Sequence, residues 1–142
     1  MNLSEHFRVE EFVTPTIFNA YGEASKWYID VTVVAFMEEI RERFGKPVNV
    51  NDWYRDGHLQ ERGHRLPDTT TGAWYSQHKF GRACDFHIDG ITPDQIFNDV
   101  LQNQQLYLDF GVTTIEDVAM TPTWIHLDCR WTGLETIKVV QP

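Results

Sequence analysis

Residues 76–85, Ser-Gln-His-Lys-Phe-Gly-Arg-Ala-Cys-Asp, contain two side chains that can bind a metal ion, His78 and Asp85. A neutral imidazole nitrogen and a carboxylate oxygen both suit zinc. Gly81 lies between them, where a chain that turns back toward one ion needs a residue without Cβ. From residue 83 onward, the pattern has period two, which predicts a strand with one face in the core. The expected apolar face holds Cys84, Phe86 and Ile88, and the polar face holds Ala83, Asp85 and His87.

A second segment, Trp124-Ile-His-Leu-Asp-Cys-Arg130, repeats this alternation near the end of the chain. Its apolar face holds Ile125, Leu127 and Cys129, and its polar face holds Trp124, His126, Asp128 and Arg130. If the two segments are adjacent antiparallel strands, His78, Asp85 and His126 lie together. Each residue alone fits an ordinary surface or hydrogen-bonding role. The set of three, with a fourth position left to water, is typical of a catalytic zinc site, so we expect one Zn²⁺ per chain.

The motif Ser76-x-His78-x-x-Gly81-x-Ala83-x-Asp85, followed by Trp124-Ile-His126-Leu-Asp128, resembles the zinc D-Ala-D-Ala carboxypeptidase family. That family also contains L-Ala-D-Glu endopeptidases from phage endolysins, and the hedgehog signalling domain shares its fold. The opening segment, residues 3–12, is similar to a short opening found in cell-wall peptidases of the family. The resemblance implies a zinc metallopeptidase, either a D,D-carboxypeptidase or an endopeptidase, that cleaves bacterial peptidoglycan stem peptides or cross-links.

The resemblance also implies two residues that bind substrate. Family members carry a Ser-Gly-Tyr-Arg type segment at the end of a strand, and its arginine binds the substrate carboxylate. In this chain Tyr54-Arg55 fits that segment, while Asp52 and Trp53 replace the usual small residues. A guanidinium is planar and bidentate, which suits a carboxylate. We therefore expect Arg55 to bind a substrate carboxylate and Ser76 to help orient it.

The catalytic base is expected near the last metal ligand. Many family members place an acid three residues before that ligand, where this chain has a threonine, so the base must come from elsewhere. Asp128 shares the polar face of His126. A hairpin with its turn at positions 121 and 122 would place Asp117 directly opposite His126, and a slip of one residue would place Glu116 there. We predict Asp117 as the base and Asp128 as support for the ring of His126, with Glu116 as the alternative.

Length and composition predict one globular domain over residues 1–142, because 42% of the residues are apolar. The expected fold is α+β, with helices packed on a small, mainly antiparallel sheet that carries the zinc site. The net charge of −9 argues against nucleic acid as a partner, since such binding relies on contacts from Lys and Arg to phosphate. The two cysteines are expected to be reduced, buried and apolar in character.

Targeting signals are not evident in the sequence. No run of about 18 apolar residues is present, so no membrane-spanning segment is expected. The N-terminal stretch lacks the basic and apolar regions of a signal peptide. We therefore expect synthesis in the cytoplasm and action on the cell wall, either as a phage lysis or virion component or as a bacterial enzyme that remodels the wall. The oligomeric state is left open.

Helix and strand signals complete the prediction. Helices are expected over residues 25–44 and 92–104, and strands over residues 48–51 and 112–120. Residues 14 and 15 are expected to break the chain, residues 56–75 to form a loop at the rim of the site, and residues 138–142 to be a plain tail.

An alternative function from another class is a non-catalytic zinc-binding structural or recognition domain with the same fold.

Overall fold

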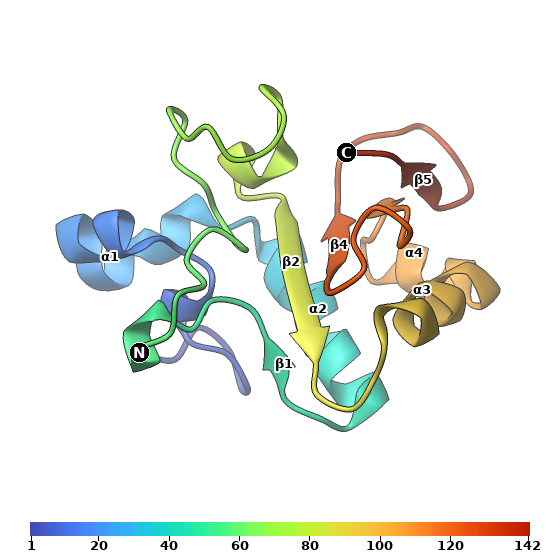
Figure 1. Ribbon diagram of the computed structural model, residues 1–142, viewed down its shortest axis with the longest axis horizontal. Helices are drawn as coiled ribbons and strands as arrows, with labels where there is room; N and C mark the ends of the chain where they lie inside the picture. Colours follow the sequence, from blue (N-terminus) through green and yellow to red (C-terminus); the bar gives the residue numbers. More distant parts are fainter.

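A five-stranded sheet forms the framework of the computed structural model, which describes residues 1–142 (Figure 1). The strand order is β1-β2-β4-β3-β5, and only the pairing of β3 with β5 is parallel. The fold is therefore α+β with a mainly antiparallel sheet, as predicted. The strands are β1 (Val48–Asn49), β2 (Ala83–Ile88), β3 (Thr114–Glu116), β4 (Ile125–Asp128) and β5 (Lys138–Val140).

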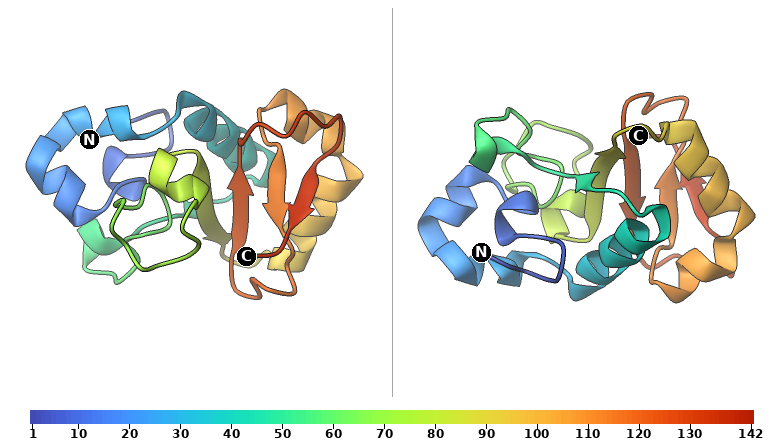
Figure 2. Two further views of the ribbon diagram at one scale, coloured as in Figure 1. Left: turned by 90° about the horizontal axis from the view of Figure 1, so that it is seen from above. Right: turned by 90° about the horizontal axis from the view of Figure 1, so that it is seen from below.

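Helices from the middle of the chain cover one face of this sheet, and the helix closest to the N-terminus lies apart from it (Figure 2). The α-helices are α1 (Pro15–Tyr21), α2 (Val31–Phe44), α3 (Pro93–Gln102) and α4 (Gln104–Asp109), and 3₁₀ turns are η1 (Val9–Glu11), η2 (Gly22–Tyr28), η3 (Trp53–Arg55) and η4 (Gln77–Phe80). Side chains of α2, α3 and α4 meet the apolar faces of β2 and β4 in one core, which includes Phe36, Met37, Ile40, Ile96, Val100, Tyr107, Cys84, Phe86, Ile125 and Leu127. The alternation predicted for both strands is confirmed. None of the helices is long and apolar enough to cross a membrane.

Two helical regions differ from the prediction because of their N-caps. The side chain of Thr14 accepts a hydrogen bond from the amide of Ile17, and Pro15 occupies the first helical position, so α1 begins where a break was expected. The expected helix over residues 25–44 is divided, because the side chain of Asp30 accepts a hydrogen bond from the amide of Thr32 and begins α2 after η2. Its predicted end is confirmed at Gly45, which adopts a left-handed conformation.

The connection between β3 and β4 is longer than the expected two-residue turn. β3 ends at Glu116, and Asp117 opens a turn in which its side chain accepts a hydrogen bond from the amide of Ala119. The pairs Thr114–Asp128 and Ile115–Leu127 set the register. This register, continued by one residue, places Glu116 opposite His126, so the register predicted for Asp117 is wrong. The expected tail instead begins with β5, which pairs with β3.

The loop of residues 56–76 lies beside the start of β2 (Figure 1). Backbone hydrogen bonds hold it there: the amide of Asp85 donates to the carbonyl of Arg62, and the amide of Arg65 donates to the carbonyl of His78. These bonds hold the loop, whose sequence has no periodic pattern, against the polar face of the sheet, where it forms one wall of the site.

Candidate metal centre

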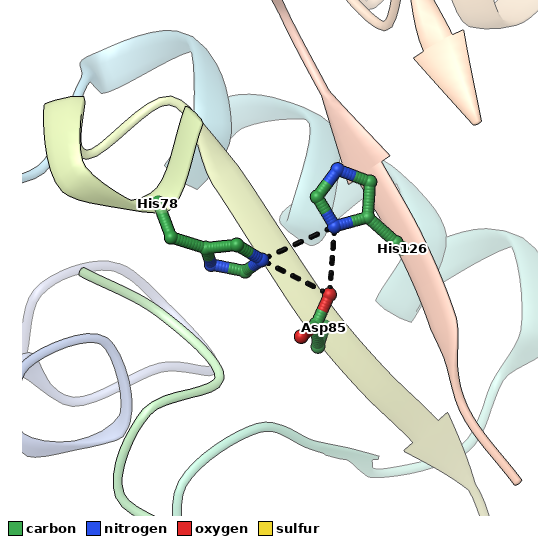
Figure 3. Close-up of side chains that lie close together, drawn as sticks. All are labelled: His78, Asp85 and His126. Carbon is green, nitrogen blue, oxygen red and sulfur yellow. Dashed lines mark hydrogen bonds and ion pairs between the residues drawn. The ribbon is translucent and has the colours of Figure 1, made fainter. Parts of the chain in front are cut away.

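Three buried side chains converge on the polar face of the sheet (Figure 3). His78 comes from η4, Asp85 from β2 and His126 from β4, and Asp85 pairs directly opposite His126 in the sheet. Nε2 of His78 lies 3.1 Å from Oδ1 of Asp85 and 3.1 Å from Nδ1 of His126. That Nδ1 atom lies 2.8 Å from the same carboxylate oxygen. This group could hold a metal ion.

Gly81 directs the chain from His78 back into β2. It has a φ of +66°, and a Cβ atom there would collide with the backbone oxygen of Tyr28. The carbonyl of Gly81 also accepts a hydrogen bond from the amide of Asp30, which fixes the turn against the start of α2. The expectation that this position needs a residue without Cβ is confirmed.

A second layer of hydrogen bonds determines which atom each side chain presents to the centre. The carbonyl of Gly63 can only accept, so Nδ1 of His78, 2.7 Å away, donates to it and leaves Nε2 free. Nε2 of His126 donates to Oδ2 of Asp128 at 3.0 Å and leaves Nδ1 facing the centre. Such outer partners orient metal ligands and fix their tautomers.

The carboxylate ligand is fixed in the same way by an arginine. Nη2 of Arg65 donates to Oδ2 of Asp85 at 2.8 Å, so Oδ1 is the oxygen directed at the two imidazoles. Asp128 is in turn held by Arg130, whose Nε lies 2.9 Å from Oδ1. Each of the three donor atoms therefore belongs to a side chain whose other polar atom is already bonded.

The electrostatics of the metal-free centre follow from burial and these contacts. Burial lowers the pKa of His78, which favours the neutral form of its ring. Burial would also lower the pKa of His126, but the hydrogen bonds to Asp128 and Asp85 outweigh it and raise the pKa to about 9. Burial would raise the pKa of Asp85, but both imidazoles hold it well below its usual range. A cation bound by the three donors would have to displace the proton from the donor nitrogen of His126, because metal ligands must be deprotonated.

A cavity of about 650 Å³ opens over the three donors. Glu116 lies on its wall, with Oε1 3.8 Å from Nδ1 of His126 and only 17% of the side chain exposed. Ser76, predicted to contact substrate, also lines this cavity. Other lining residues come from the loop before η4 and from η4 itself, from positions on either side of β4 and from the end of the chain: Arg65, Thr71, Gly72, Ala73, Tyr75, Gln77, Trp124, Arg130, Val140, Gln141 and Pro142.

Two predicted site residues, Asp117 and Arg55, lie away from the donors, whereas Asp128 bonds to the ring of His126 as predicted. Asp117 is outside the cavity, since its side chain bonds within the turn after β3. Arg55 is exposed in η3, with its guanidinium 5.0 Å from the ring centre of Tyr54, and lines no part of the cavity. Asp128 is fully buried on the side of the His126 ring that faces away from the donors, where it supports the ring.

Sequence patterns predicted Asp128 as the partner of His126 and did not reveal the partners of the other two ligands. Arg65 and Gly63 lie in the aperiodic loop, and no spacing rule connects them to His78 or Asp85. The residues at the end of the chain reach the cavity only because β5 pairs with β3.

Comparisons of the chain with models of protein families, with curated proteins and with solved structures found no match. We therefore infer the chemistry of the site from its own residues alone. Two imidazole nitrogens and one carboxylate oxygen, each oriented by an outer partner, lie at the base of a cavity that also contains a carboxylate from Glu116.

Proposed function

We propose that this protein is a zinc metallopeptidase that hydrolyses peptide bonds in bacterial peptidoglycan. The observation that carries the proposal is the buried set of His78, Asp85 and His126 below an open cavity. Two imidazoles and a carboxylate with one open position form a typical catalytic zinc site. Zinc bonds of about 2.0–2.1 Å at tetrahedral angles separate ligand atoms by about 3.3 Å. The donor atoms here are separated by 2.8–3.1 Å, so a small adjustment accommodates the ion.

The substrate class is supported by the resemblance of the two motifs to the zinc D-Ala-D-Ala carboxypeptidase family. In support of it, Ser76, His78 and Asp85 of the first motif line one cavity, and Gly81 forms the turn that follows His78. A hedgehog-like arrangement of the sheet and action on the cell wall in phage lysis or in the virion are part of the same proposal.

We assign the role of general base to Glu116. When bound, zinc would lower the pKa of a water molecule and polarise the scissile carbonyl. Glu116 would accept the proton of that water and return it to the leaving amine. It lies opposite His126 on the cavity wall, whereas Asp117 and Asp128 are turned away from the donors. Arg65 and Asp128 would hold Asp85 and His126 in their orientations.

The experiment compares two neighbouring carboxylates in purified, zinc-loaded protein. We expect Glu116→Gln to keep its zinc and to slow muropeptide hydrolysis by roughly 10²–10⁴-fold, the usual effect of losing a general base. Asp117→Asn is the matched control and should keep nearly full activity. Mass spectrometry of the digested muropeptides identifies the bond that is cleaved.

Two outcomes would contradict the proposal. A slow Asp117→Asn variant beside a fully active Glu116→Gln variant would reverse the assignment of the base. A wild-type protein that binds one zinc per chain and cleaves no muropeptide would instead favour the non-catalytic zinc-binding domain.

A further inference from the structure

A second cavity, of about 330 Å³, lies beside the one over the metal centre. The two share four lining residues, Arg65, Thr71, Asp85 and Trp124. The ion pair of Arg65 with Asp85 lines both, so the second cavity adjoins the metal centre at this pair. Residues 58–62 of the long loop form the remaining wall.

Arg62 is the unusual residue of this second cavity. It is half-buried, and its Nη1 atom donates to Nδ1 of His87 at 2.7 Å. No carboxylate lies within ion-pair distance of its guanidinium, in contrast to Arg65 and Arg130, which pair with Asp85 and Asp128. Burial and then the charge of Arg62 lower the pKa of His87, the residue that accepts this hydrogen bond, which favours its neutral form.

The acidic residues near Arg62 already have donors. Glu61 accepts hydrogen bonds from the hydroxyls of Thr69 and Thr71, both at 2.5 Å. Asp52 accepts a hydrogen bond from the amide of Leu59 at 2.7 Å. Asp85, the carboxylate whose charge acts most strongly on Arg62, is already paired with Arg65, so the guanidinium of Arg62 has no carboxylate within ion-pair distance.

A partly buried cation without an ionic partner is unfavourable for the stability of the fold, and an anionic ligand would relieve this cost. Burial lowers the pKa of Arg62, which reflects the loss of solvation around its charge. The chain has 21 acidic residues against 12 basic ones, so an acidic partner within the protein would have been easy to supply. A carboxylate from a ligand would form two charge-assisted hydrogen bonds with the free edge of the guanidinium.

We propose that the second cavity is a carboxylate subsite, in which Arg62 binds a carboxylate group of the peptide whose scissile bond lies at the metal centre. This inference rests on the proposed peptidase function and specifies its substrate as an anionic peptide. The carboxylate can be a C-terminal one or an acidic side chain. The first source predicts a carboxypeptidase, and the second predicts an endopeptidase.

The test measures binding separately from hydrolysis. The zinc-loaded Glu116→Gln protein is titrated calorimetrically with four N-acetylated tetrapeptides, which combine a free or amidated C-terminus with an internal Glu or Gln. We expect one of the two carboxylates to strengthen binding by roughly 10- to 100-fold, the range for hydrogen bonds to charged groups. The carboxylate that produces the effect identifies the source.

Variants made in the same Glu116→Gln background assign the effect to Arg62. Arg62→Gln should abolish the preference for the carboxylate, and Arg62→Lys should retain part of it, since lysine keeps the charge and loses the bidentate geometry. Arg55→Gln is the matched control, because Arg55 is exposed and lies outside both cavities, and it should keep the full preference. Zinc content and thermal unfolding verify that each variant is folded, and Arg62→Lys tests the assignment if Arg62→Gln does not fold.

Three results would overturn the inference: equal binding of all four peptides, a full preference in folded Arg62→Gln or Arg62→Lys, or a preference lost in Arg55→Gln. These results are distinct from a failure of the proposed function. If the wild-type enzyme hydrolyses peptides without a carboxylate preference, only the inferred subsite is refuted. If the protein binds carboxylates through Arg62 and hydrolyses none of the peptides, the peptidase function is refuted and the subsite stands.

Discussion

Replacing Asp128 by asparagine removes the anion that orients one metal ligand and leaves the ligand itself unchanged. Asp128 is fully buried and accepts hydrogen bonds from Nε2 of His126 at 3.0 Å and from Nε of Arg130 at 2.9 Å. An asparagine can offer one neutral oxygen to the imidazole, so the ring becomes a weaker and less firmly oriented ligand. Arg130 is 32% exposed on its side chain, and water can replace part of its lost partner.

The expected loss of zinc affinity in Asp128→Asn is about 10- to 100-fold, which corresponds to about 1.4–2.7 kcal/mol. Competition with a chromophoric zinc chelator measures this difference directly. At saturating zinc, the variant should hydrolyse substrate much faster than Glu116→Gln, because the base is intact. Asp117→Asn is the control for a nearby lost carboxylate, since its side chain bonds only within the turn after β3. An unchanged zinc Kd in folded Asp128→Asn, or an equal loss in Asp117→Asn, would refute the assigned role.

Two further predictions concern stability. The pKa of His126 is about 9 in the folded protein and 6.5 in the unfolded chain. Protonation of His126 therefore stabilises the protein without bound metal by about 3 kcal/mol below pH 6.5, and this contribution is lost as pH rises through 9. Urea unfolding of chelated protein at pH 6 and pH 9.5 should show the loss, and the same slope in His126→Gln would contradict it. Gly81→Ala should destabilise the protein by about 2 kcal/mol more than Gly45→Ala, because both glycines have positive φ and only Gly81 has backbone where a Cβ would lie. Equal unfolding free energies for these two variants would show that the turn after His78 tolerates a side chain.

The parts of the site that lie on regular strands could be predicted from the sequence. Alternation along residues 83–88 and 124–130 placed Asp85 and His126 on one polar face, because side chains of a strand point to opposite faces in turn. The glycine at position 81 could be predicted for a similarly local reason, since the turn has no room for a Cβ. Local geometry was sufficient for these features.

Features that depend on turn length or tertiary contacts could not be predicted in the same way. The choice between Glu116 and Asp117 depends on the register of β3, and the register depends on a connection longer than two residues. Arg62 and Arg65 reach the site through hydrogen bonds between an aperiodic loop and β2 or η4, and no period in the sequence encodes those bonds. The start of α1 differs from the prediction although Thr14 caps this helix and Pro15 takes its first position, as Thr92 and Pro93 do in α3.

The metal content of the purified protein tests the central claim most directly. After exposure to zinc and removal of excess ion, elemental analysis should find about one zinc per chain, because the three donors form one site. His78→Ala and His126→Ala should lose the ion, whereas His58→Ala, which changes an exposed loop histidine, should retain it. A wild-type protein that binds no zinc, or ligand variants that bind as much as the wild type, would contradict the account.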